Sequence, residues 1–182
     1  MRKRIVEKSQ AHHILIHILI GLVCALIVSK KHDGENLIAL LLLGIVGNLL
    51  PDIDHVIYYL TYGKDSEYSQ IIKLFIKEKD FKEVKKFLRD NHKYLTGLYS
   101  HTLLSPILSI ILTYLFLINN KIYLATLFLS ITIHFLYDIF EDLLFFKRLN
   151  PNWLMHLNRK NKNNDGILLP YLEFLRSKKK PS

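Results

Sequence analysis

Histidine and aspartate side chains, which are common ligands of divalent metal ions, gather in four short segments of this 182-residue chain. His13 and His17 are four residues apart, as are His134 and Asp138, so each pair lies on one face of a helix. A His-x-x-x-Asp pair on a helix can offer an imidazole nitrogen and a carboxylate oxygen to one metal ion. Imidazoles combined with carboxylates indicate zinc or another first-row divalent ion. The other two segments are Pro51-Asp52-Ile53-Asp54-His55 and Tyr99-Ser100-His101-Thr102.

Pro51 separates one of these segments from the apolar run before it. Proline disfavours the helical conformation in the preceding residue, which predicts the end of a helix here. Asp52 and Asp54 then lie in a turn or in the first turn of a new helix, where neighbouring carboxylates could bridge two cations. Each residue also has a plain structural interpretation, since a lone His17 can hydrogen-bond between helices and Asp52 alone can cap a helix. Ionisable residues at membrane depth are costly and usually functional, which favours the metal site.

Four apolar runs, none of which contains Lys or Arg, must position these side chains. A helix that crosses a bilayer needs about 20 mostly apolar residues. The third and fourth runs reach that length, whereas the first and second are short unless their polar flanks are included. Core helices of a soluble bundle are the alternative, and the paired layout of the runs predicts two αα-hairpins. We expect an all-α fold, a four-helix membrane bundle, built from residues 14–28, 37–50, 102–118 and 122–139.

The distribution of charge predicts how these helices lie in the membrane. The chain has 25 Lys and Arg residues against 16 Asp and Glu residues, and the basic residues concentrate in the first, third and fifth hydrophilic segments. Basic residues favour the cytoplasmic side, so both termini are predicted to lie in the cytoplasm. Runs one and three then begin at the cytoplasmic face, and runs two and four end there. All four His and Asp segments are therefore predicted to meet at one membrane face.

The long hydrophilic segment at about residues 61–95 is predicted to be a cytoplasmic, amphipathic helical insertion into a single domain of residues 1–182. Asp80 followed by Glu83 resembles a capping box. The basic face of this helix either attracts anionic lipid or is simply solvated. No specific nucleic-acid binding is expected, because acidic residues are interspersed here and in the basic tail at about residues 147–182. The apolar face carries Phe81, Val84, Phe87 and Leu88.

The order of these segments resembles the YdjM-like family of membrane-bound metal-dependent hydrolases. The resemblance covers about residues 11–142, and Pro-Asp-Ile-Asp-His is its most specific part. It is carried by His13-Ile14-Leu15-Ile16, Leu49-Leu50-Pro51-Asp52-Ile53-Asp54-His55, Tyr99-Ser100-His101-Thr102-Leu103-Leu104 and His134-Phe135-Leu136-Tyr137-Asp138. The resemblance implies a metal site made of His13, Asp52, Asp54, His101, His134 and Asp138, together with His55.

One feature of the family pattern is displaced in this chain. The family usually has His-Arg-Gly five residues ahead of the histidine of the third motif, where this chain has Thr96. The nearest pair of a histidine and a basic residue is His92-Lys93, nine residues ahead. The roles of His92, His12 and His17 therefore stay open.

The resemblance implies an integral inner-membrane hydrolase that cleaves an ester or phosphoester with metal-activated water. The expected cofactor is one or more divalent ions, with Zn²⁺ first, and Asp52 or Glu141 could act as the general base. A more distant likeness, in the order of His and Asp residues only, to zinc-dependent phospholipase C and single-strand nucleases points to phosphoesters. A site at the bilayer boundary suits a lipid substrate. The alternative is a non-enzymatic integral membrane protein with a structural or regulatory metal site.

Overall fold

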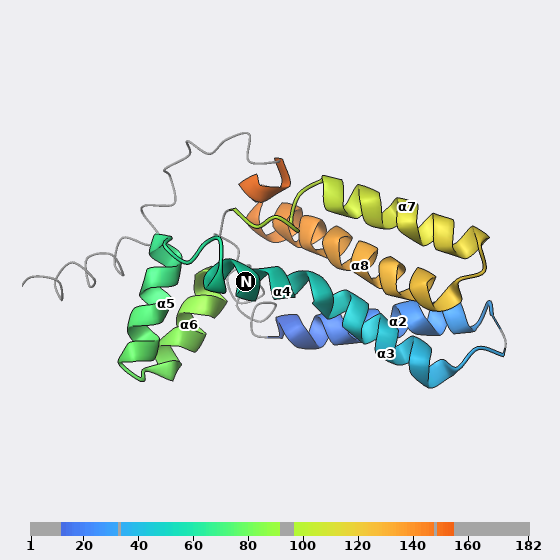
Figure 1. Ribbon diagram of the computed structural model, residues 1–182, viewed down its shortest axis with the longest axis horizontal. Helices are drawn as coiled ribbons and strands as arrows, with labels where there is room; N and C mark the ends of the chain where they lie inside the picture. Colours follow the sequence, from blue (N-terminus) through green and yellow to red (C-terminus); the bar gives the residue numbers. More distant parts are fainter. Residues whose placement is uncertain (1–11, 33, 92–96, 148, 155–182) are drawn as a thin grey trace, which may run out of the picture.

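The described part of the chain folds into helices joined by turns (Figure 1). This computed structural model describes residues 12–32, 34–91, 97–147 and 149–154, and no strand occurs within those ranges. The predicted all-α fold class is therefore confirmed. The helices in chain order are α2 (His13–Ser29), α3 (Leu37–Leu49), α4 (Ile53–Leu60), α5 (Glu67–Lys77), α6 (Phe81–Asn91), α7 (Leu104–Ile118) and α8 (Ile122–Glu141).

The four helices that the apolar runs form lie side by side (Figure 1). α2 packs against α3 and α7 against α8, and α8 joins the two pairs because it also packs against α3 and α2. Two glycines bring α2 and α3 into backbone contact. A Cβ on Gly21 would lie 2.4 Å from the carbonyl oxygen of Gly44, and a Cβ on Gly44 would lie 2.3 Å from that of Gly21. Small residues at such contacts are the usual means of close packing between membrane helices.

The bundle buries several polar side chains beside its apolar core, and its outer surface is apolar. His17, Asn48, Thr126 and Ser130 are all fully buried between the helices. Large aliphatic side chains point outward from each of the four helices instead. A water-soluble monomer rarely exposes contiguous apolar surface on this scale, so the distribution is that of helices that contact lipid. The exposed side chains include Ile14, Leu19, Val23, Leu42, Val46, Ile107, Ile111, Leu115, Leu124 and Leu136.

Two helical segments are long and apolar enough to cross a membrane, judged by length and composition alone. They are Leu37–Leu60 and Ile122–Leu144, whereas His13–Ser29 and Leu104–Ile118 are shorter apolar helices. The prediction that the third run reaches spanning length is therefore wrong, whereas the second run, as predicted, reaches that length only when the residues that flank it are included. The helical path of the second run continues past its proline, and the helix of the third run begins only at Leu104.

A short 3₁₀ turn, η1 (Leu50–Asp52), explains why the second run continues. Pro51 lies at the start of this turn, where its missing N–H has no intrahelical partner to lose. α4 resumes directly at Ile53, so the proline interrupts the α-helix without ending the helical path. Asp52 lies in η1 and Asp54 in the first turn of α4, as predicted.

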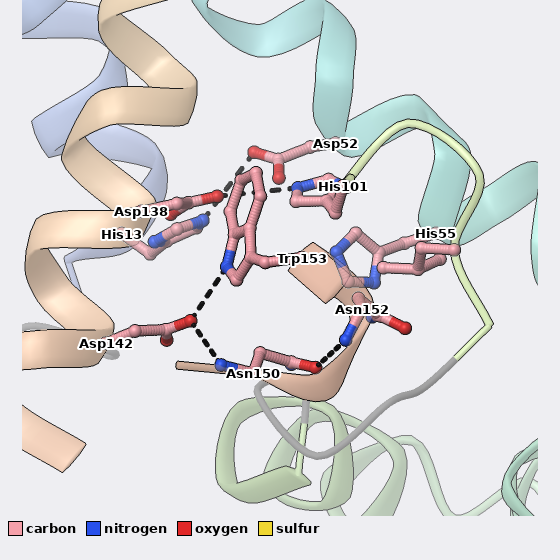
Figure 2. Close-up of a pocket in the computed structure, with 10 residues that line it drawn as sticks. His13, Asp52, His55, His101, Asp138, Asp142, Asn150, Asn152 and Trp153 are labelled. Carbon is pink, nitrogen blue, oxygen red and sulfur yellow. Dashed lines mark hydrogen bonds and ion pairs between the residues drawn. The ribbon is translucent and has the colours of Figure 1, made fainter. Parts of the chain in front are cut away.

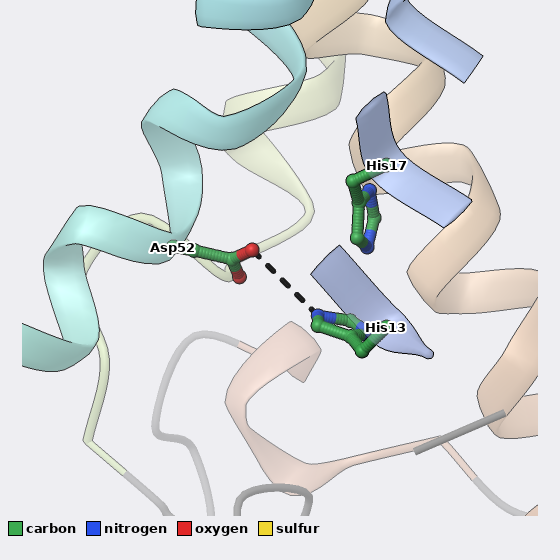
Figure 3. Close-up of side chains that lie close together, drawn as sticks. All are labelled: His13, His17 and Asp52. Carbon is green, nitrogen blue, oxygen red and sulfur yellow. Dashed lines mark ion pairs between the residues drawn. The ribbon is translucent and has the colours of Figure 1, made fainter. Parts of the chain in front are cut away.

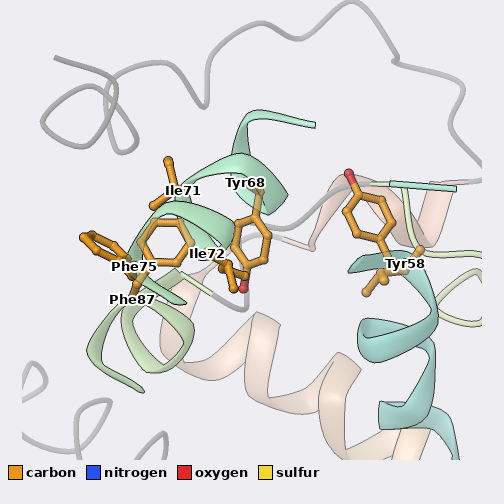
Figure 4. Packing of buried hydrophobic residues seen from close by; sticks show 7 residues of the cluster. Tyr58, Tyr68, Ile71, Ile72, Phe75 and Phe87 are labelled. Carbon is orange, nitrogen blue, oxygen red and sulfur yellow. The ribbon is translucent and has the colours of Figure 1, made fainter. Parts of the chain in front are cut away.

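The predicted insertion is a helical hairpin, α5 and α6, whose small apolar core also includes Tyr58 of α4 (Figure 4). The backbone N–H of Glu83 donates to Asp80 Oδ1 at 3.1 Å, which confirms the predicted cap. The predicted apolar face is only partly buried, because Phe81 and Leu88 are exposed. Residues 155–182, most of the predicted basic tail, lie outside the described residues. The core contains Tyr58, Tyr68, Ile71, Ile72, Phe75, Phe87 and Leu98.

The Gly21–Gly44 contact predicts that Gly44→Val destabilises the protein, because the added side chain would meet the α2 backbone. Overpacking of this kind typically costs about 1–3 kcal/mol of unfolding free energy. A thermal melt of the detergent-purified protein should show a lower midpoint. Val46→Ile is the matched control, because Val46 is exposed on the same helix. Equal midpoints for the two variants would contradict the close approach of the helices.

Candidate metal centre

The four predicted His and Asp segments meet at one end of the bundle (Figure 2). α2 and α8 contribute two pairs of side chains, η1 and α4 contribute a third set, and the segment before α7 contributes His101. The cluster contains four groups of three side chains, and within each group the three ligand atoms lie within 4.8 Å of one another. The groups are His13, His17 and Asp52; His17, His134 and Asp138; Asp52, His55 and His101; and His13, Asp138 and Glu141.

His134 lies at the centre of this cluster and is fully buried. Its Nδ1 is 2.6 Å from the backbone carbonyl oxygen of Asn48, which can only accept, so Nδ1 carries the hydrogen. Nε2 of the neutral ring then presents a lone pair. This atom lies 3.3 Å from Asp138 Oδ2 and 3.8 Å from Asp52 Oδ1, and it has no hydrogen-bond partner among the described residues. A lone pair that faces two carboxylates is unfavourable unless a cation lies between them.

His101 is oriented by a chain of hydrogen bonds that starts at Asp54. Ser100 Oγ donates to Asp54 Oδ2 at 2.8 Å, and the backbone N–H of Ser100 donates to the same oxygen at 2.8 Å. Because the hydroxyl hydrogen of Ser100 points to the Asp54 carboxylate, Ser100 Oγ accepts a hydrogen bond from His101 Nδ1 at 2.8 Å. Nε2 of His101 is left to face Asp138 Oδ2, at 3.4 Å. Outer hydrogen bonds of this kind orient the histidines of metal sites.

Asp54, which was predicted as a metal ligand, belongs to none of the four groups. Its Oδ2 accepts from Ser100, and its Oδ1 accepts from the hydroxyl of Tyr62 at 2.5 Å. Burial and this hydrogen bond to Asp54 raise the pKa of Tyr62 above its ordinary value. The structure therefore places Asp54 behind His101, one hydrogen-bonded step away from the cluster.

The remaining predicted residues surround Asp52. His13 Nε2 lies 3.6 Å from Asp52 Oδ2 (Figure 3), and His55 shares a group with Asp52 and His101. Asp52 and Glu141, the two predicted candidates for the general base, differ in how far solvent can reach them. The Asp52 side chain is 26% exposed, whereas Glu141 is 1% exposed.

A pocket opens onto this cluster, and part of its wall comes from a turn that the sequence did not indicate (Figure 2). The turn is η4 (Pro151–Leu154). Asp142 fixes it to the end of α8, because its Oδ2 accepts from Trp153 Nε1 at 2.9 Å and from the Asn150 N–H at 3.0 Å. No motif or spacing connects these residues with the metal-ligand segments. The pocket is lined by His13, Asp52, His55, Leu98, His101, Asp138, Asp142, Asn150, Asn152 and Trp153.

The histidines whose roles were left open fall into three situations. His12 is exposed just before α2 and belongs to no group. His17 is fully buried and lies beside the rings of His13 and His134, with centroids 4.3 and 4.2 Å away. His92 lies outside the described residues.

Comparison with known proteins adds one finding. A family model described as YdjM inner membrane protein matches residues 13–143, which is well over half of the chain. The matched range includes every residue of the four candidate metal-ligand groups. No curated protein and no solved structure gave a significant match.

The hydrogen-bond chain behind His101 predicts that Ser100→Ala weakens metal binding. Loss of the hydroxyl frees the His101 ring to rotate, and removal of such an outer partner typically costs about 10- to 100-fold in metal affinity. A competition titration of the purified protein with a zinc chelator measures this change. Ser105→Ala is the matched control, because the Ser105 hydroxyl contacts Thr102 instead. Unchanged affinity in Ser100→Ala would show that the chain does not orient a ligand.

Proposed function

The chain belongs to the YdjM inner membrane protein family, and we propose that it is a membrane-bound metal-dependent hydrolase with its reaction centre in the pocket at the end of the bundle. The observation that supports this proposal is the convergence of acceptor atoms on one point. Nε2 of His134, Nε2 of His101 and the carboxylates of Asp52 and Asp138 face one another at 3.3–3.8 Å.

This set of donors fits a divalent ion of the zinc type. Imidazole nitrogen and carboxylate oxygen are both zinc ligands, and buried carboxylates need hydrogen-bond donors or a cation. The residues that would hold the ion at the pocket are Asp52, His55, His101 and Asp138, with His13 and His134 beside them. Asp54 supports the site through Ser100 rather than by direct ligation. When bound, such an ion polarises an ester or phosphoester and lowers the pKa of a water molecule.

Asp52 is the side chain best placed to accept a proton from water in the pocket. It lines the pocket and is partly exposed, and His13 lies within reach of its Oδ2 to take the proton onward. Glu141 does not line the pocket. Its carboxylate is buried and lies close to ligand atoms of His13 and Asp138 instead. We therefore assign the general base to Asp52 and a supporting role to Glu141.

The position of the pocket favours a lipid substrate with an ester or phosphoester in its headgroup region. The helical path of the Leu37–Leu60 segment continues eight residues beyond Asp52, or about 12 Å at 1.5 Å per residue. Its outward side chains there are still apolar, and so are those just after Asp138. A pocket at this level lies near the boundary of the hydrocarbon layer rather than in open water. The exposed apolar residues are Ile53, Val56, Ile57, Leu60, Phe140, Leu143 and Leu144.

The excess of basic residues in the hydrophilic segments supports a cytoplasmic location for both termini and for the pocket. A cytoplasmic pocket would meet the leaflet that carries anionic lipids. An anionic phosphoester headgroup is therefore the first substrate class to test.

This proposal predicts that the purified protein carries divalent metal and that His101→Ala and Asp138→Ala lose both metal and turnover. Metal content is measured by mass spectrometry of the detergent-purified protein. Hydrolysis is measured on a panel of phosphoesters and phospholipids, before and after chelation and after reloading with Zn²⁺. His12→Ala is the matched control, because His12 belongs to no metal-binding group, and it should keep both properties.

Two outcomes would count against the proposal in different ways. Full metal content in the Asp138→Ala variant would contradict the assignment of the site. Bound metal without hydrolysis of any substrate in the panel would instead favour a structural or regulatory metal site in a non-enzymatic membrane protein.

A further inference from the structure

One of the metal-binding groups lies deeper in the bundle than the pocket. It consists of His17 on α2 with His134 and Asp138 on α8, and all three side chains are buried. His13 and Asp138 line the pocket, whereas His17 and His134 lie one helical turn further inside and do not. The function proposed above uses Asp138 and His134 but leaves His17 without a role.

The hydrogen bonds of Asn48 define which nitrogen of His17 is available. Asn48 Nδ2 donates to the carbonyl oxygen of Ser130 at 2.9 Å, so Asn48 Oδ1 faces the other way, toward His17. His17 Nδ1 lies 2.7 Å from this Oδ1 and must carry the hydrogen, because an amide oxygen only accepts. Nε2 of His17 therefore presents a lone pair. It is buried and has no hydrogen-bond partner among the described residues.

His134 is held in the same way by the same residue. Its Nδ1 donates to the backbone carbonyl of Asn48, so in the neutral ring its Nε2 is also an acceptor. Two neutral imidazoles that present only lone pairs cannot hydrogen-bond to each other through these atoms. His17, His134 and Asp138 form a buried group in which one ligand atom of each residue lies within 4.8 Å of the others. Such a group is stable around a cation and unfavourable without one.

We propose that the protein has a second divalent metal position, formed by Nε2 of His17, Nε2 of His134 and the carboxylate of Asp138. It lies next to the position at the pocket, where Asp52, His55 and His101 form a group, and His17 also forms a group with His13 and Asp52. Asp138 belongs to both positions, because its Oδ2 lies 3.4 Å from His101 Nε2 and 3.3 Å from His134 Nε2. A carboxylate shared between two ions is a common feature of hydrolytic sites with two metals. The inference rests on the proposed metal site but not on the identity of its substrate.

The test counts metal ions per chain in the full-length, detergent-purified protein loaded with Zn²⁺. Wild type should hold about two ions, and His17→Leu should hold about one, because the pocket group is intact. His12→Leu is the matched control and should hold about two. Asn48→Leu should weaken the second ion about 10-fold or more, because it removes the hydrogen bond that orients His17 but leaves the backbone carbonyl that orients His134.

A titration of the metal-free wild type with Co²⁺ tests the inference without a variant. The visible absorption of the bound ion should rise over two equivalents, and His17→Leu should lose the second. Saturation of wild type at one equivalent would overturn the second position, as would two ions retained in His17→Leu; a proton would then be the cation of the inner group. Absence of any bound ion in wild type would overturn the proposed function as well, so the two failures are distinguishable.

Discussion

The burial of carboxylates inside an apolar bundle is the constraint on which the rest of this structure depends. An ionised carboxylate that leaves water needs hydrogen-bond donors or a cation. Asp54 and Asp142 are supplied with donors, from Ser100 and Tyr62 in one case and from Trp153 in the other. Asp52 and Asp138 instead face the imidazole nitrogens of His13, His101 and His134, at 3.3–3.8 Å. A cation bound among these rings would favour the ionised form of both carboxylates.

The unequal lengths of the helices create the space in which these groups meet. α2 begins at His13, one turn before His17, and α7 begins just after His101. The Leu37–Leu60 and Ile122–Leu144 segments continue past the same level. The shorter helices therefore leave room beside the longer ones, and the η4 turn and the Ser100-His101 segment line it. Backbone contact between α2 and α3 at Gly21 and Gly44 brings these two helices close enough for His17 to reach Asn48.

The sequence predicted the all-α fold and the meeting of the four ligand segments because both follow from regular patterns. Four apolar runs with alternating basic links define an up-and-down order, and this order brings the ends that carry His and Asp together. It did not predict the different roles of Asp52 and Asp54, which look equivalent in Pro-Asp-Ile-Asp-His. On a helical path residues two apart point about 200° away from each other, so only one can face the cluster. Asp52 faces the histidines, and Asp54 faces Ser100 and Tyr62.

Other features have no sequence signal at all. Asn48 is a single amide in an apolar run, and its three hydrogen bonds to His17, His134 and Ser130 depend on packing between α2, α3 and α8. Trp153 reaches the pocket because Asp142 accepts from its indole, a contact that no spacing rule describes. The second run also continued beyond its proline, since a 3₁₀ turn places Pro51 where its missing N–H costs nothing.

The two proposed metal positions differ in their access to solvent, and this difference bears on what each could do. Structural zinc sites are closed by protein ligands, whereas catalytic sites keep a coordination position open to water or substrate. The group of Asp52, His55 and His101 lines the pocket, and two of its three members are only partly buried. The group of His17, His134 and Asp138 is entirely buried and has no pocket residue except Asp138. The proposed chemistry is therefore best assigned to the outer position, while an ion at the proposed inner position would supply the positive charge that keeps Asp138 ionised within an apolar bundle.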